Sequence, residues 1–104
     1  MSQTSSGSSL TLSIAGELDM QTIEVLAARV DQNRKQQFTS LTLDLGELAF
    51  MDSSGLKYLI ELNDRSQSEA WRLKLIRPRH AAAATVLRVT GADTFLPFER
   101  EAGP

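Results

Sequence analysis

The sequence predicts a small α/β domain: a mostly parallel sheet of about four strands in the order β-α-β-α-β-α-β, with helices packed mainly on one face. Segments in which Leu or Ile alternates with polar residues predict half-buried strands. Between them lie segments whose apolar residues recur every three or four positions, as in amphipathic helices. The connections are short, so neighbouring strands should be parallel with right-handed crossovers. A chain of 104 residues is long enough for one such domain with its own core.

The first third of the chain predicts a tail, a strand and a helix. Residues 1–9 are Ser, Thr, Gln and Gly after the first methionine, and we expect a flexible N-terminal tail because they offer no further apolar side chain to bury. The domain itself should span residues 10–98. Alternation over residues 10–14 predicts the first strand, and apolar residues at helical spacing over 23–30 predict the first helix. Asp19 is placed to cap that helix.

The central part of the chain predicts a strand, a polar turn and a second helix. Residues 41–45 alternate between Leu and polar residues and predict a buried strand. We expect Leu48 and Phe50 to pack inward after it. The turn MDSSG follows at residues 51–55, and apolar residues at helical spacing then predict a helix to about residue 69. The turn therefore lies at the carboxyl end of a strand, where open α/β sheets place their functional groups.

The last third predicts one more strand and helix. Residues 71–77 alternate as a strand would, Pro78 breaks the pattern, and residues 79–89 predict a third helix. Apolar residues at 95–98 predict a short last strand or an apolar patch. Residues 99–104 are polar and predict a C-terminal tail.

Charge and composition restrict the possible functions. A net charge of −2 argues against nucleic-acid binding, which needs clustered positive charge. The chain has no cysteine and predicts neither a signal peptide nor a membrane-spanning helix, so we expect a cytoplasmic protein without disulfides or thiolate metal sites. A basic group follows the third strand, and charge that protects an exposed strand edge explains it best: Arg72, Lys74, Arg77, Arg79 and His80.

The turn at residues 52–55 has a plain structural explanation and several chemical ones. Asp and Ser are preferred helix N-caps, so the structural explanation is that the turn starts a helix and has no further function. Serine catalysis is disfavoured because His80 is the one available base and no G-x-S-x-G elbow is present. The phosphate-binding motif G-x-x-x-x-G-K-[ST] is absent as well. Asp19, Asp44 and Asp52 are too scattered in sequence to be strong evidence for Mg²⁺.

Phosphorylation is the chemistry that suits this turn. A phosphate on Ser53 would add about −1.5 to −2 charges at a helix N-terminus. The helix dipole favours negative charge there by about 0.3–1 kcal/mol, so the domain should stay folded. A partner that covers the turn would have to desolvate the added charge. Even about 4 kcal/mol of lost binding is roughly a thousandfold in affinity.

Two motifs carry a resemblance to a known family. GELD at residues 16–19 follows the first predicted strand, and LAFMDSSGL at residues 48–56 follows the second. With these motifs the chain resembles the STAS domain over roughly residues 10–98, and more narrowly the bacterial anti-sigma factor antagonists of the SpoIIAA type. Family members usually carry an additional N-terminal strand and a further C-terminal helix, whereas residues 1–9 and 99–104 of this chain predict tails.

The resemblance implies a binding protein rather than an enzyme. Its partner would be an anti-sigma factor that is a GHKL-type serine kinase. The unphosphorylated antagonist binds this kinase and frees the sigma factor. The kinase then phosphorylates the antagonist with ATP, and a PP2C-type phosphatase resets the cycle. ATP would belong to the partner, so no cofactor is implied for this chain.

By position, Ser53 matches the phosphorylated serine of the family, and Asp19 matches an acidic residue implicated in partner contact. Asp52, Ser54 and Gly55 complete the turn at the interface. The nearest alternative is a STAS domain that acts, without phosphorylation, as a scaffold or subunit of a signalling or lipid-transport complex. A monomer and a weak dimer both remain open.

Overall fold

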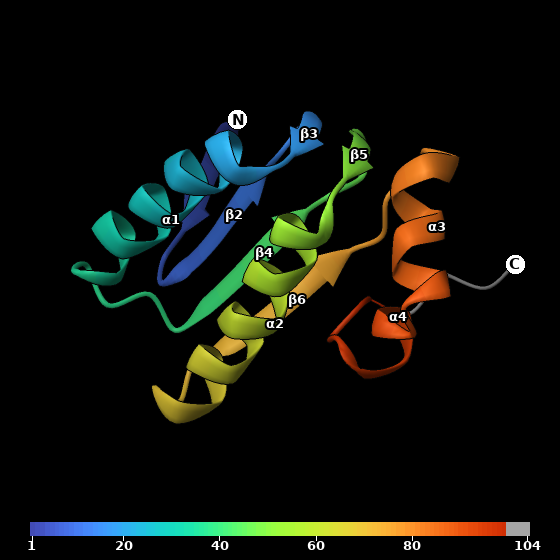
Figure 1. Ribbon diagram of the computed structural model, residues 1–104. Helices are drawn as coiled ribbons and strands as arrows, with labels where there is room; N and C mark the ends of the chain where they lie inside the picture. The colour runs from blue at the N-terminus through green and yellow to red at the C-terminus, as the bar shows by residue number, and fades with distance from the viewer. Residues whose placement is uncertain (100–104) are drawn as a thin grey trace, which may run out of the picture.

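The core of the computed structural model, which describes residues 1–99, is a four-stranded sheet in the order β1-β2-β4-β6 (Figure 1). β2 pairs parallel with β4 and β4 pairs parallel with β6, whereas β1 pairs antiparallel with β2. The bounds of these strands are β1 Ser2–Ser6, β2 Ser9–Ser13, β4 Ser40–Asp44 and β6 Arg72–Ile76. The predicted mostly parallel α/β fold is confirmed.

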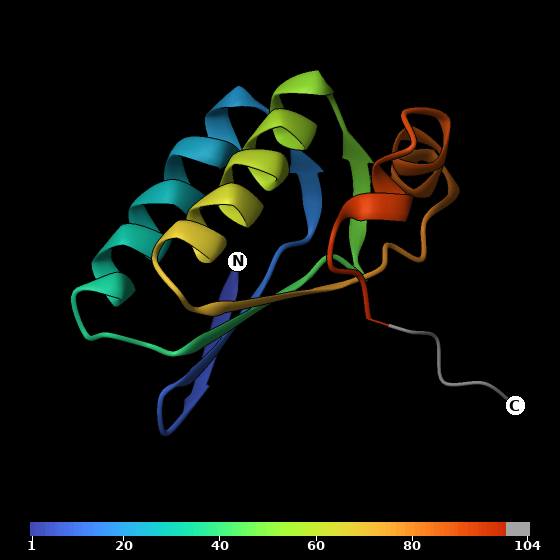
Figure 2. The same ribbon diagram turned by 90° about the horizontal axis from the view of Figure 1, so that it is seen from below.

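Two long helices cover one face of this sheet. Figure 2 shows α1 (Met20–Arg34) and α2 (Ser53–Ser68) side by side over that face, with the shorter α3 (Ala81–Val89) and α4 (Ala92–Phe95) beside them. Among residues 1–99, no helix is long and apolar enough to cross a bilayer.

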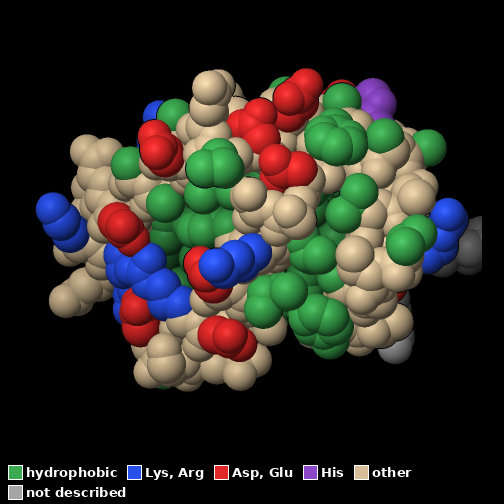
Figure 3. Space-filling model, viewed as in Figure 1, with side chains coloured by type: hydrophobic (Ala, Val, Ile, Leu, Met, Phe, Trp, Pro, Cys, Tyr) green, Lys and Arg blue, Asp and Glu red, His purple; other side chains and the backbone are tan. Residues whose placement is uncertain are grey.

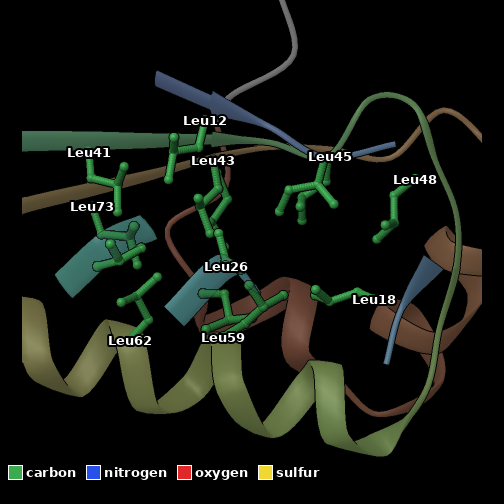
Figure 4. Close-up of a cluster of buried hydrophobic side chains, with 14 of the residues drawn as sticks. Leu12, Leu18, Leu26, Leu41, Leu43, Leu45, Leu48, Leu59, Leu62 and Leu73 are labelled. Carbon is green, nitrogen blue, oxygen red and sulfur yellow. The ribbon is translucent and has the colours of Figure 1, made fainter. Parts of the chain in front are cut away.

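Leucines fill the space between the sheet and the long helices. Leu12, Leu43 and Leu75 lie opposite one another on β2, β4 and β6, and all three are fully buried. Leu59 and Leu62 of α2 point toward the sheet from the other side (Figure 4). Leu and polar residues alternate along these strands because one face of the sheet packs against the helices and the other face carries polar side chains.

A second, two-stranded sheet lies beyond the ends of the main strands and was not predicted. It consists of β3 (Gly16–Leu18) and β5 (Leu48–Met51), which pair parallel. Leu48 is buried as predicted, but the prediction for Phe50 is wrong, because its side chain is 46% exposed. In this short strand the buried positions are the two ends, Leu48 and Met51, and Phe50 faces outward between them.

The structure corrects the prediction for the first residues of the chain and decides between the two alternatives for residues 95–98. Residues 2–6, predicted to belong to a flexible tail, form β1, because an edge strand is stabilised by backbone pairing and needs no buried side chain of its own. Residues 95–98 form no full strand, because α4 ends at Phe95 and a single bridge joins Phe98 to Leu75. The apolar alternative applies to Leu96, which is buried, and to Phe98, which packs against the core. Glu99 lies against β6, its N–H donating to Leu75 O at 2.7 Å. The rest of the predicted C-terminal tail, residues 100–104, lies outside the described residues.

Candidate functional site

The small sheet brings the N-termini of both long helices to one place. Leu18, the last residue of β3, is paired with Met51, the last residue of β5. The next residue in each segment is the N-cap of a helix: Asp19 caps α1 and Asp52 caps α2. The backbone N–H of Asp52 donates to Leu18 O at 3.3 Å, which joins the two helix starts directly.

Asp19 holds the first turn of α1. Its carboxylate accepts the backbone N–H groups of Gln21 and Thr22, both at 3.1 Å. In return, the N–H of Asp19 donates to Thr22 Oγ1 at 2.9 Å, completing a reciprocal capping arrangement. The hydrogen bond from the Thr22 backbone is the main cause that lowers the pKa of Asp19 below its ordinary value.

This cap predicts an acid-dependent part of the stability. Because the folded-state pKa of Asp19 is lowered, its contribution is present at pH values above the unfolded pKa and is lost as pH falls through the folded pKa. Asp19→Asn keeps a good N-cap but cannot ionise. We therefore expect the difference in melting temperature between wild type and Asp19→Asn to shrink between pH 7 and pH 2. A difference in melting temperature that stays constant from pH 7 to pH 2 would contradict the role of the charged cap.

The turn before α2 is built by Asp52 and Gly55. Asp52 Oδ1 accepts the Gly55 N–H at 3.0 Å, and Asp52 O accepts the Leu56 N–H at 3.1 Å. Gly55 is buried against β3, and a Cβ at this position would lie 2.5 Å from the backbone oxygen of Leu18 and 2.9 Å from Met51 Cγ. Only glycine allows α2 to approach β3 this closely.

Ser53 and Ser54 differ in their surroundings. Ser53 is the first residue of α2 and its side chain is exposed, whereas Ser54 is only partly exposed. Within the described part of the chain, neither the Asp19 cap nor the Asp52 cap uses the Ser53 hydroxyl. Ser53 is therefore accessible and is not needed to cap the helix.

A shallow groove runs from this turn between α1 and α2. Met20 and Ile23 of α1 line one wall, and residues of α2 line the other: Ser54, Lys57, Tyr58 and Glu61. The side chain of Met20 is 71% exposed. Figure 3 shows acidic side chains gathered at the end of the molecule where the two helices begin, with apolar side chains between and beside them. The groove thus places the exposed Met20 side chain close to charged residues at the start of the two helices.

Met20 and Tyr58 were missed in the sequence analysis. Met20 simply follows a cap residue, and the exposure of its side chain depends on the helix orientation. The Tyr58 hydroxyl is buried and makes no hydrogen bond to residues 1–99, and burial raises the pKa of Tyr58 to about 12. Tyr58 thus stays protonated and neutral in the wall of the groove.

The alternative of a cation site is not supported by the arrangement of the aspartates. Asp44 ends β4, and its Oδ1 accepts the Gly46 N–H at 2.9 Å, so its carboxylate stabilises the turn that follows β4. Within residues 1–99, no three His, Asp or Glu side chains gather in a way that could hold a metal ion.

Comparison with known proteins assigns the family. The STAS_2 family model, described as "Mlab, STAS domain", matches residues 1–97. The chain belongs to this family. The resemblance that rested on the GELD and LAFMDSSGL motifs is confirmed at the level of the STAS domain, and the match also includes β1.

Solved structures share the STAS fold of this chain. The structure of the anti-sigma factor antagonist SpoIIAA in its unphosphorylated form has 22% identity and a TM-score of 0.76, covering 96% of this chain and 88% of that one. An anti-sigma factor antagonist from Mycobacterium paratuberculosis has 23% identity and a TM-score of 0.78, with coverage of 96% and 84%. The Bacillus cell fate determinant SpoIIAA in the phosphorylated form has 22% identity and a TM-score of 0.69, with coverage of 96% and 91%. No curated protein matches the chain.

Proposed function

We propose that this STAS domain is an anti-sigma factor antagonist, a binding protein rather than an enzyme, that is switched by phosphorylation of Ser53. The unphosphorylated form binds an anti-sigma factor kinase of the GHKL type and frees the sigma factor. Phosphorylation by that kinase, which carries the ATP, releases the complex, and a PP2C-type phosphatase reverses it. The observation that carries the proposal is the exposed Ser53 on a turn whose capping is done by Asp52.

The geometry favours Ser53 over Ser54 as the modified residue. A kinase must enclose the serine hydroxyl, and Ser53 is the more exposed of the two side chains. At the first position of α2 a phosphate also lies next to the positive end of the helix dipole. The phosphate should therefore leave the fold stable and should weaken the binding of a protein partner that covers the turn.

The partner surface proposed here combines both helix starts with the groove. Asp19, Asp52 and Ser54 lie with Ser53 at the two helix starts, which the pairing of β3 with β5 brings together, and Met20 adds an exposed apolar contact. Gly55 is buried, so its part in the surface is to set the close packing of the turn on β3. A bound partner would then bury Ser53, and phosphorylation would place an uncompensated charge in that interface. The similarity in fold to SpoIIAA, solved in unphosphorylated and phosphorylated forms, supports this cycle.

The second candidate is a STAS subunit of a signalling or lipid-transport complex that is not phosphorylated. One observation favours it: the description of the matching family model names Mlab and does not name the anti-sigma factor antagonists. The same surface would then hold a permanent partner. A non-kinase protein that copurifies in stoichiometric amount with the chain, together with an unmodified Ser53, would select this candidate.

Phosphorylation by the host kinase tests the proposal in vitro. Wild type, Ser53→Ala and Ser54→Ala are incubated with host extract and ATP, and incorporated phosphate is measured by intact mass. We expect one phosphate on wild type and on Ser54→Ala and none on Ser53→Ala. Phosphate retained by Ser53→Ala would reject this site, and phosphate on none of the three would favour the second candidate.

A further inference from the structure

The two edges of the main sheet are protected very differently. At the β6 edge, Arg72 and Lys74 are exposed charges. Residues 97–99 cover part of this edge, since Leu75 N–H donates to Pro97 O at 2.9 Å and Glu99 N–H donates to Leu75 O. Charges and covering segments are the usual means by which proteins block pairing of an exposed edge strand with another chain.

The β1 edge has none of these protections. Its sequence, SQTSS, contains no charge and no proline, and all five residues are exposed. The register with β2 runs from Ser2–Ser13 to Ser6–Ser9 without a bulge, so the strand is regular along its length. The N–H and C=O groups on its outer side are therefore aligned to accept another strand.

Side chains of α1 hold β1 in place. Gln3 Oε1 accepts hydrogen bonds from Arg29 Nη1 at 3.1 Å and from Asn33 Nδ2 at 3.3 Å, which tie β1 to α1. Val25 lies one turn before Arg29 on α1, and its side chain is 55% exposed. The flank thus combines a fixed, uncharged strand with an exposed apolar side chain.

We propose that β1 pairs antiparallel with β1 of a second copy of the chain about a two-fold axis. The two four-stranded sheets would then join into one continuous sheet. A second copy is favoured because SQTSS is self-complementary in this arrangement: with Thr4 opposite Thr4, every facing side chain is small or uncharged. A formal net charge of only −2 per chain opposes this approach little.

The dimer should be weak. A pairing of five residues buries less than the roughly 800 Å² per partner of a standard stable interface. A dissociation constant of roughly 10 μM to 1 mM is expected, which corresponds to the lower range of specific association. The pairing leaves the turn at Ser53 free, since α1 lies between β1 and α2 (Figure 1). Each dimer would therefore present two partner surfaces.

Sedimentation equilibrium of the full chain between about 10 μM and 1 mM tests the proposal, a range set by the expected affinity. Thr4→Lys places like charges directly opposite each other and should weaken the dimer roughly tenfold or more. Thr4 is exposed, so the melting temperature should not change. Thr85→Lys on α3, at the opposite side of the molecule, is the matched control and should dimerise like wild type.

A charge pair then tests the register. Mixing Thr4→Lys with Thr4→Asp should restore the dimerisation that each variant alone has weakened, and the backbone amides of residues 2–6 should exchange hydrogen more slowly as wild-type concentration rises. A wild-type chain that stays monomeric throughout the range overturns the proposal. So does a dimer that Thr4→Lys leaves intact, because its interface would lie elsewhere.

Discussion

Replacement of Ser53 by Asp is expected to weaken binding of the kinase partner roughly a hundredfold or more, since an unpaired charge buried in an interface costs several kcal/mol. The same change should leave the melting temperature almost unaltered. Ser53 is the exposed first residue of α2, and negative charge at a helix N-terminus is favourable. Binding is measured by calorimetry with the purified partner and folding by thermal denaturation.

Ser53→Asn is the matched control for this experiment, because it has nearly the same size as Asp but no charge. We expect it to bind within a few-fold of wild type, as Ser53→Ala should. Equal losses for Asp and Asn would show that shape, and not charge, is read at this position. A large fall in melting temperature for Ser53→Asp would mean that the serine has a structural role.

Gly55→Ala is expected to cause the largest loss of stability among single changes at the site. The new Cβ would lie 2.5 Å from Leu18 O, a backbone atom that also accepts the Asp52 N–H. To relieve this clash, α2 must move away from β3. Overpacking of this kind costs about 1–3 kcal/mol, or roughly 5–20 °C in melting temperature for a domain of this size.

The neighbouring change Ser54→Ala separates this clash from a general effect of altering the turn. Its position is partly exposed and already carries a Cβ, so the melting temperature should stay within about 2 °C of wild type. A Gly55→Ala protein as stable as Ser54→Ala would show that α2 and β3 can separate without cost. The close approach of the two helix starts would then not be a fixed feature of the fold.

The long strands and helices could be predicted because each buries one face. The alternating segments at residues 10–14, 41–45 and 71–77 correspond to β2, β4 and β6. The Leu residues of these strands are all buried. β1 escaped prediction because an edge strand exposed on both faces leaves no hydrophobic pattern. The short β3 and β5 escaped because three or four residues are too few for periodicity.

The candidate site was predicted residue by residue but not as an arrangement. Asp19 and Asp52 were each identified as possible caps, yet their proximity depends on the pairing of Leu18 with Met51, which no local pattern reveals. The stretch Asp52-Ser53-Ser54 offers three residues of the type that caps helices. Only the structure assigns the cap to Asp52, and this assignment leaves Ser53 free for chemistry.

The phosphorylation state of the chain in its own host tests the central claim most directly. Protein expressed there at native level is analysed by intact and peptide mass spectrometry. The proposed switch predicts a fraction carrying one phosphate, mapped to the peptide that contains Ser53 and absent from a Ser53→Ala strain. A chain in which Ser53 is unmodified under all growth conditions, and remains so after incubation with host extract and ATP, would contradict it.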